Sequence, residues 1–286
     1  MKIYYYAYTG HKYGLERARR AAVILKKLNE KGYDTMLLVN DFRAGLATRE
    51  LGVPESINIE GVQDIDAIAQ TGDVVIIDTP EDDHGRLVKY CADFKQVFRF
   101  AEHKEDSAIH GEVMLTINPK DDAISALIVD DIYFEEHKKE ERTVFFLGDS
   151  DADKTILSNS DFFEKNRMEL ILGDYFYVKY EQDLERIFIT LHESEDYTNL
   201  ICSSSRVVTA SYQTALEASV SGAEVIFIDL NQISNEKKEL LSSLNVIFII
   251  SFNNEIYQQI IIDNVSKNRI YVERSDTIVT KIINQL

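Results

Sequence analysis

The sequence predicts an α/β protein with two doubly wound, Rossmann-like domains. Its short apolar runs, such as VVIID at Val74–Asp78, are continuous rather than alternating, which is typical of parallel strands covered on both faces. Helical spacings separate many of these runs. The chain has 286 residues, of which 45% are hydrophobic, and this is enough to form two cores of ordinary size.

The first half opens with a predicted strand, KIYYYAY, followed by a helix over Glu16–Lys31 that ends at Gly32. The further strands predicted in this half are DTMLLVN, VVIID, KQVFRF and VMLTI. A helical pattern from about Glu81 to Ala92 lies between VVIID and KQVFRF. The order of strands and helices predicts one parallel sheet.

A charged run, EEHKKEER at Glu135–Arg142, interrupts the apolar rhythm, and we interpret it as a helix end and a linker. It predicts an N-terminal domain over residues 1–140 and a C-terminal domain over residues 141–286. The strands predicted in the second domain are RTVFFLG, ELILG, FYVKY, IFITL, VVTA, EVIFIDL and VIFIIS.

Helical patterns in this domain include Tyr212–Ser221 and Asn235–Ser243. The last stretch, Thr277–Leu286, predicts a short amphipathic helix that can pack on either domain. In parallel sheets ligands bind at the carboxyl ends of the strands, so we expect the site in the cleft between two facing domains.

Composition narrows the function classes. The formal net charge of −18 argues against nucleic acid as a partner, although a small anion needs only a local positive field. No apolar segment reaches the ~18–20 residues of a membrane span, and the N-terminus lacks a signal layout. Cys91 and Cys202 lie far apart without a framework pattern, which indicates a cytoplasmic location. No Cys/His pair has zinc-site spacing, so we predict neither a metal nor a cofactor.

The loop after the first strand, TGHKYGLERARR at Thr9–Arg20, is the first candidate site. A glycine-containing turn that leads into a helix N-terminus presents backbone N–H groups to an anion, and Arg17, Arg19 and Arg20 add positive charge. The alternative is an exposed basic turn whose arginines pair with nearby carboxylates. The string is not GxGxxG, so it does not predict a dinucleotide site.

The second candidate is TASYQTALEASVSG at Thr209–Gly222, between two predicted strands. A carboxylate at Glu217 can accept two ribose hydroxyls while the helix N-terminus faces a phosphate. The alternative is that Glu217 only complements the helix dipole and that Gly222 ends the helix.

Two acidic segments also follow strands. LGDSDADK at Leu147–Lys154 predicts either a phosphate-facing turn or a capped helix start. Asp78 and the run EDDH at Glu81–His84 follow VVIID, where a carboxylate can bind a substrate hydroxyl or act as a base. The alternative for this run is a helix cap with acidic residues in the first turn.

Together these segments resemble the GT-B superfamily, and in particular the UDP-sugar hydrolases of the pseudaminic acid pathway, with the peptidoglycan UDP-GlcNAc transferase as a more distant relative. RVVTASYQTALEASVSGAEVIFI resembles the family's strand–TAGGSTxxE–helix–G–strand segment, LNQISNEKKELLSSLNVIFI resembles NQxxN–helix, and FLGDSDADK resembles FGGSDPxN. The residues in register are Thr209, Ala210, Thr214, Glu217, Gly222, Asn231, Gln232, Asn235, Gly148, Ser150 and Asp151.

The resemblance implies roles for these residues. Glu217 would hold the ribose, and the backbone from Thr209 through Ala210 and Ser211 to Thr214 would face the diphosphate. Asn231 and Gln232 would approach the sugar or the phosphate. These expectations apply to a UDP-linked sugar bound between two GT-B domains.

One departure affects the expected chemistry. The hydrolases have G-x-G-H-x-x-R after the first strand, and alignment from Gly14 places Glu16 at the second glycine and Arg17 at the histidine. Arginine is not a general base near neutral pH, although it binds phosphate strongly. If the protein is catalytic, the remaining candidate bases are Glu16, Asp78 and His11.

We therefore expect a nucleotide-sugar-binding GT-B protein of surface-glycan or flagellar-glycan synthesis, similar to a glycosyltransferase or to a UDP-sugar hydrolase. A protein of the same glycan pathway is a further expected partner. The alternative is a non-catalytic GT-B protein that binds or regulates and has lost the hydrolase histidine.

Overall fold

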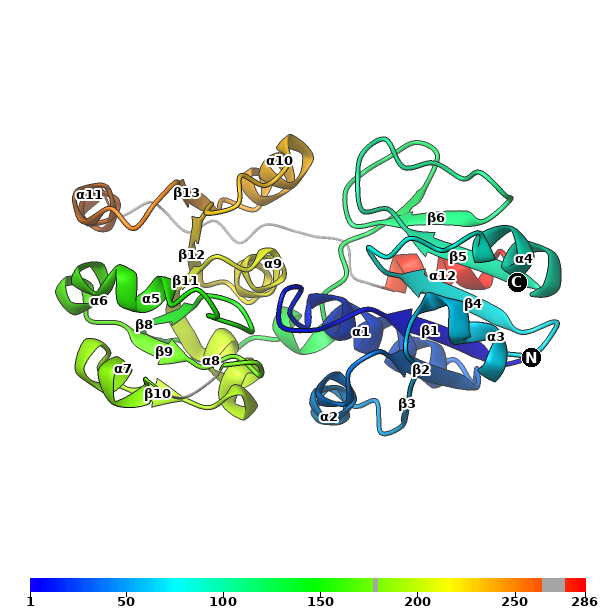
Figure 1. Ribbon diagram of the computed structural model, residues 1–286. Coiled ribbons are helices and arrows are strands. Elements are labelled where there is room, and N and C mark those ends of the chain that lie inside the picture. The colour runs from blue at the N-terminus through cyan, green and yellow to red at the C-terminus, as the bar shows by residue number, and fades with distance from the viewer. Residues whose placement is uncertain (177–179, 264–275) are drawn as a thin grey trace. The chain divides into compact units, whose positions relative to one another are not determined.

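A computed structural model describes residues 1–176, 180–263 and 276–286 (Figure 1). By its contacts the chain divides into two compact units between Val129 and Asp130, and the C-terminal helix belongs to the first unit. This division falls before residue 140, where the sequence places the domain boundary. We describe each unit by itself.

Unit 1 is built on a seven-stranded sheet with the order β3-β2-β1-β4-β5-β6-β7. Its strands are β1 (Ile3–Ala7), β2 (Thr35–Val39), β3 (Ser56–Asn58), β4 (Val74–Asp78), β5 (Gln96–Phe100), β6 (Val113–Thr116) and β7 (Ile124–Ser125). Every neighbouring pair is parallel. The strand order reverses between β1 and β4, and this is the position at which doubly wound sheets open a crevice for ligands.

The helices of unit 1 are α1 (Glu16–Glu30), α2 (Phe42–Glu50), the 3-10 turn η1 (Val62–Asp64), α3 (Ile65–Ile68), α4 (Arg86–Asp93) and α12 (Asp276–Ile283). The last helix, α12, packs against α1, and Lys27 Nζ lies 3.3 Å from Asp276 Oδ1. The C-terminal segment therefore returns to the first unit.

Strand β1 is unusual because three of its five residues are tyrosines, and all five are buried. A buried tyrosine needs a partner for its hydroxyl group. Tyr5 donates to Asp78 Oδ2 at 2.8 Å, and Tyr6 donates to Glu81 Oε2 at 2.6 Å. The two hydroxyls thus tie β1 to acidic side chains at and just after the carboxyl end of β4.

Unit 2 is built on a six-stranded sheet with the order β10-β9-β8-β11-β12-β13. Its strands are β8 (Glu140–Phe146), β9 (Glu169–Ile171), β10 (Leu191–His192), β11 (Ser204–Thr209), β12 (Glu224–Ile228) and β13 (Ile247–Ile249). All neighbours are parallel here too.

The helical elements of unit 2 are η2 (Asp131–Phe134), α5 (Thr155–Ser158), α6 (Ser160–Asn166), α7 (Glu181–Ile187), η3 (Ser194–Asp196), α8 (Tyr197–Ser203), α9 (Tyr212–Val220), α10 (Asn235–Ser243) and α11 (Asn254–Asp263). Part of the core is aromatic: Phe145 of β8 packs against Phe163 and Phe188, with ring centroids 4.7 Å and 6.3 Å away.

The predicted fold class, two α/β units with parallel sheets, is confirmed. Three local predictions are wrong. The helix expected from about Glu81 begins only at Arg86, after Gly85, so the run EDDH at Glu81–His84 precedes the helix and places no acidic residue in its first turn. Residues 140–142 of the supposed linker begin β8, where Glu140 and Glu141 are exposed and polar because the strand starts outside the buried part of the sheet. The segment IFITL (Ile187–Leu191) is not a strand. Its first residue, Ile187, ends α7, and only its last residue, Leu191, belongs to β10. In the predicted strand FYVKY, residues 177–179 lie outside the described residues.

No helix in the described ranges is both long and apolar enough to cross a membrane.

Candidate functional site

The loop after β1 is a tight turn. The backbone N–H of Gly14 donates to the carbonyl oxygen of Gly10 at 2.8 Å, and Gly14 has a φ of 67°, which favours glycine. Thr9 and Asn40 are joined in both directions, by Thr9 N–H to Asn40 Oδ1 at 2.7 Å and by Asn40 Nδ2 to Thr9 O at 3.0 Å. The glycines therefore turn the chain, and Asn40, the residue after β2, fixes the start of the loop.

Two of the three arginines of α1, Arg17 and Arg20, contact carboxylates. Arg20 donates to both oxygens of Asp78, from Nε at 2.6 Å and from Nη2 at 2.5 Å. Arg17 donates to both oxygens of Glu102, at 3.2 Å and 2.6 Å, and its Nε lies 3.4 Å from Asp78 Oδ1. Two positive and two negative groups thus form one cluster.

Burial strengthens the electrostatic interactions between the charged side chains of this cluster. The side chain of Asp78 is fully buried, and those of Arg17 and Arg20 are 11% and 13% exposed. Burial by itself lowers the pKa of Arg20, but the adjacent Asp78 carboxylate raises that pKa well above its ordinary value. Burial and the same carboxylate raise the pKa of Tyr5. Arg20 also lies 4.9 Å from the centroid of the Phe100 ring.

The arginines pair with nearby carboxylates, as the alternative interpretation of this loop expects, but that interpretation is wrong in placing them in an exposed turn, because both side chains are largely buried. An anionic ligand at Arg17 or Arg20 competes with Asp78 and Glu102. Asp78 has no exposed surface, and its oxygens accept from Tyr5 and Arg20, so the geometry gives no support to its role as a base. Ligand contacts of these residues stay predictions.

The other two candidate bases lie near the start of α1. His11 is exposed in the turn, and Glu16 is the half-buried first residue of α1. A carboxylate at that position complements the positive end of the helix dipole. Their catalytic roles stay predictions.

In unit 2, the turn from β11 into α9 is closed by hydroxyl groups. Thr209 Oγ1 donates to the carbonyl oxygen of Phe146 at 2.7 Å and accepts from the backbone N–H of Ser211 at 3.0 Å. Ser211 caps α9, because its Oγ accepts from the backbone N–H of Thr214 at 3.3 Å. The backbone N–H of Ala210 donates to Phe146 O at 3.3 Å, so the turn joins β8 and β11 at their carboxyl ends.

Glu217 lies in α9 within a hydrogen-bonded group of side chains. Its Oε2 accepts from the hydroxyl of Tyr197 at 2.6 Å, and its Oε1 accepts from Gln213 Nε2 at 2.9 Å. The Tyr197 hydroxyl is also 2.7 Å from Thr214 Oγ1. Glu217 is only 3% exposed, so its carboxylate does more than complement the helix dipole.

Sequence reasoning missed two side chains that contact Glu217, those of Gln213 and Tyr197. Gln213 stands four residues before it, a spacing that brings side chains together on a helix, so the pair was detectable. Tyr197 begins α8, a helix that no sequence pattern predicted, and its contact with Glu217 depends on the packing of α8 against α9.

The acidic segment after β8 is a capped helix start. Asp151 accepts from the backbone N–H groups of Thr155 and Ile156 at 2.6 Å and 3.2 Å. Burial raises the pKa of Asp151 despite these bonds. Gly148 has a φ of 144°, and Ser150 beside it is half-buried. Of the two alternatives for this segment, the capped helix start therefore describes Asp151.

Asn231 and Gln232 follow β12 in an exposed turn before α10. Gln232 has a φ of 52°, and the neighbouring Asp229 accepts from the backbone N–H of Ile233 at 2.8 Å. Both candidate side chains are therefore accessible. Over the described ranges, no three His, Cys, Asp or Glu side chains are grouped as a metal site requires.

Comparisons with known proteins agree on the fold. No sequence-family model matches the chain, and no curated protein matches it significantly. The structure is similar to a UDP-GlcNAc 2-epimerase from Methanocaldococcus jannaschii in complex with UDP-GlcNAc and UDP, with a TM-score of 0.61 and 12% identity over 99% of each chain. It is also similar to MurG from Acinetobacter baumannii, with a TM-score of 0.59 and 10% identity over 99% of each chain.

A third similar structure is the spinosyn rhamnosyltransferase SpnG, complexed with spinosyn aglycone, with a TM-score of 0.62 and 9% identity over 100% of this chain and 95% of that one. The fold is of the GT-B type. The resemblance to the superfamily is thus confirmed at the level of the fold, and none of these structures supports the pseudaminic acid hydrolases in particular. Because the neighbours include an epimerase and a transferase, the fold leaves the reaction open.

Proposed function

We propose that this protein binds a nucleotide sugar, linked to UDP, at the turn between β11 and α9. The observation that carries the proposal is a buried glutamate, Glu217, held in the second turn of a helix whose capped N-terminus follows a central parallel strand. Ligands of parallel sheets bind at this end of the strands, and helix N-termini favour phosphate. Structural neighbours in complex with UDP or UDP-GlcNAc support the proposal.

In this proposal the diphosphate lies at the N-terminus of α9, near Thr209–Thr214. The ribose hydroxyls donate to Glu217, which accepts from Tyr197 on one oxygen and from Gln213 on the other. A carboxylate has about four acceptor positions, so a ribose hydroxyl can join or replace the Gln213 amide on Oε1 while Tyr197 keeps the carboxylate oriented. Asn231 and Gln232, which are exposed, are the proposed contacts of the sugar or phosphate.

A second candidate is a binding protein without catalysis. It is favoured by the arginine cluster of unit 1, in which Arg17 stands at the family's histidine position and pairs with Glu102 and Asp78. If the protein is catalytic, the base is Glu16 or His11. The place of the protein in surface-glycan or flagellar-glycan synthesis rests on the sequence resemblance alone and stays a prediction.

The proposal is tested by calorimetric titration of UDP into the protein and three variants. Glu217→Gln is expected to weaken binding at least ~10-fold, because hydrogen bonds to a charged group contribute ~1.5–3 kcal/mol. Gln213→Ala is expected to leave the affinity unchanged or to increase it, because it removes a competitor for Oε1. Glu239→Gln, at an exposed site on α10, is the matched control and is expected to bind like the parent.

Equal affinity of Glu217→Gln and Glu239→Gln would show that the ribose does not contact Glu217. To separate the two candidates, UDP or UMP release from UDP-GlcNAc is measured on the parent protein. Saturable binding with release identifies an enzyme, whereas binding without release identifies the non-catalytic form.

A further inference from the structure

Two helices of unit 2 begin after neighbouring strands of its sheet. α9 follows β11, and α10 follows β12, which pairs with β11 in parallel. Each helix start is capped by a serine: Ser211 accepts from the backbone N–H of Thr214, and Ser234 accepts from the backbone N–H of Lys237. Because the strands are parallel, both helix N-termini lie at the carboxyl edge of the sheet, where the nucleotide site is proposed.

The side chain of Lys237 extends from the first turn of α10 to the first residue of α9. Its Nζ lies 5.1 Å from the centroid of the Tyr212 ring, a distance at which an ammonium group is attracted to the face of an aromatic ring. Tyr212 is the first residue of α9 and is only 6% exposed. The buried ring therefore holds the ammonium group beside the N-terminus of α9.

This position is electrostatically unfavourable for a cation. A helix N-terminus is equivalent to about half a positive charge, so a lysine in the first turn of α10 opposes the dipole of its own helix. The adjacent Lys238 is neutralised, because its Nζ lies 2.8 Å from Asp229 Oδ2. In the described parts of the chain no carboxylate forms an ion pair with Lys237, which is half-buried. An ammonium group in this surrounding favours an anion that comes from outside the chain.

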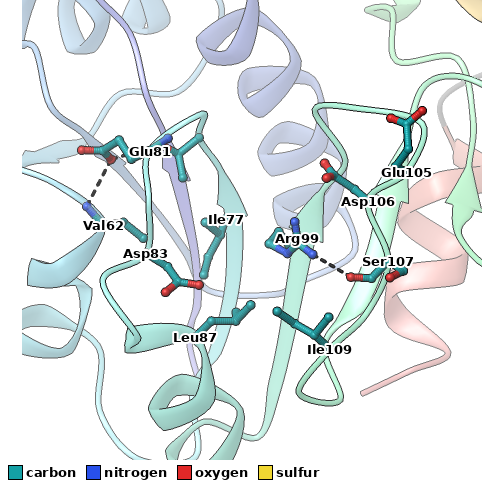
Figure 2. A pocket seen from close by; sticks show the side chains of 11 residues that line it. Val62, Ile77, Glu81, Asp83, Leu87, Arg99, Glu105, Asp106, Ser107 and Ile109 are labelled. Carbon is teal, nitrogen blue, oxygen red and sulfur yellow. Dashed lines mark hydrogen bonds between the residues drawn. The ribbon is translucent and has the colours of Figure 1, made fainter.

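The pocket of unit 1 offers no comparable place to an anion (Figure 2). Its lining includes four acidic side chains, those of Glu81, Asp83, Glu105 and Asp106. The cation of the lining, Arg99, already pairs with Glu112 at 3.2 Å. A ligand with several negative charges is repelled by this lining, so the position of Lys237 in unit 2 suits such a ligand better.

We propose that Lys237 is a phosphate-binding residue of the nucleotide site and that it makes this site prefer a nucleoside diphosphate to a monophosphate. The N-terminus of α9 supplies only about half a positive charge, and a second phosphate needs a further positive group. The ammonium group of Lys237 contacts the phosphate farther from the ribose. This inference rests on the proposed function, to which it adds a binding residue and the class of nucleotide.

UDP and UMP are titrated calorimetrically into the parent protein and into variants at one ionic strength. Lys237→Gln is expected to weaken UDP at least ~10-fold, because a charge-assisted hydrogen bond is lost, and UMP less than ~3-fold. Lys237→Arg keeps a cation over the ring and is expected to retain most of the preference for UDP. Lys165→Gln is the matched control, because it removes the same charge from an exposed site of unit 2. It is expected to change both affinities less than ~2-fold.

The outcomes separate this inference from the proposed function. An unchanged ratio of UDP to UMP affinity in Lys237→Gln, or equal effects of Lys237→Gln and Lys165→Gln, would overturn the role of Lys237. If Glu217→Gln weakens UDP in the same titrations, the nucleotide site stands without Lys237. A parent protein that does not bind UDP would overturn both the site and the role of Lys237.

Discussion

Replacing Asp78 with asparagine is expected to destabilise unit 1 strongly. The substitution keeps the size of the side chain and removes its charge, which leaves the buried Arg20 guanidinium without a full partner. Asp78 is fully buried, and Arg20 is 13% exposed. Breaking a buried ion pair by removing one partner costs ~3–5 kcal/mol, because the remaining charge stays desolvated. The Tyr5 hydroxyl loses a charged acceptor in the same step.

The matched control is Asp66→Asn. Asp66 pairs with Lys89 and Arg86, but these side chains are 47% and 42% exposed. Such exposed pairs contribute ~0–1 kcal/mol. A double-mutant cycle with Arg20→Gln isolates the pair itself, and we expect a coupling energy of ~1–3 kcal/mol between residues 20 and 78.

Stability is measured by urea unfolding followed by circular dichroism, because the chain has no tryptophan. Hydrogen exchange at the amides of β1 and β4 reports on unit 1 alone. A loss below ~1 kcal/mol for Asp78→Asn, equal to that of Asp66→Asn, would refute the reasoning. It would mean that water reaches the cluster and that Asp78 is available to ligands after all.

Three other predictions concern single positions. Gly173→Ala is expected to destabilise unit 2 by at least ~1–3 kcal/mol in calorimetry, because the Cβ of the new alanine would lie 2.3 Å from the Asp149 Cα. Unchanged stability would contradict this close approach. Burial raises the pKa of Glu112, but hydrogen bonds from backbone N–H groups and Arg99 outweigh it and hold that pKa below the ordinary 4.5. The ionised Glu112 therefore stabilises the fold above pH 4.5, and this stabilisation is lost as the pH falls through the lowered pKa. In acid unfolding, Glu112→Gln is expected to make the free energy of unfolding depend less on pH in that range. An unchanged pH dependence would count against the prediction. Burial raises the pKa of Cys202 to about 11, so a thiol reagent is expected to label it slowly at neutral pH until the protein is unfolded, and rapid labelling of the folded chain would oppose this.

The fold was predictable because its signal is local. Continuous apolar runs such as Val74–Asp78 form fully buried parallel strands, and the structure places that run in the middle of a sheet. The run IFITL failed because a short apolar segment has the same pattern at the end of a helix as in a strand. Phe188 is apolar because it packs in the aromatic core, and no strand is needed to explain it.

The candidate site was predictable only in part. The segment Thr209–Glu217 is contiguous, so its capping hydroxyls and its glutamate were visible in one motif. The partners that decide its character come from elsewhere in the chain. Arg17 pairs with Glu102 across a separation of 85 residues, and Tyr197 reaches Glu217 from another helix. Such pairings depend on tertiary packing, which a single sequence does not record.

The central claim, binding of a UDP-linked nucleotide, is tested most directly by hydrogen exchange with and without saturating UDP. The account predicts slower exchange at the backbone amides of residues 210–217, together with a stabilisation of ~2.7 kcal/mol at a UDP concentration 100 times Kd. CMP at the same concentration is the comparison and is expected to protect these amides less. No change at residues 210–217, or protection confined to other segments, would contradict the account.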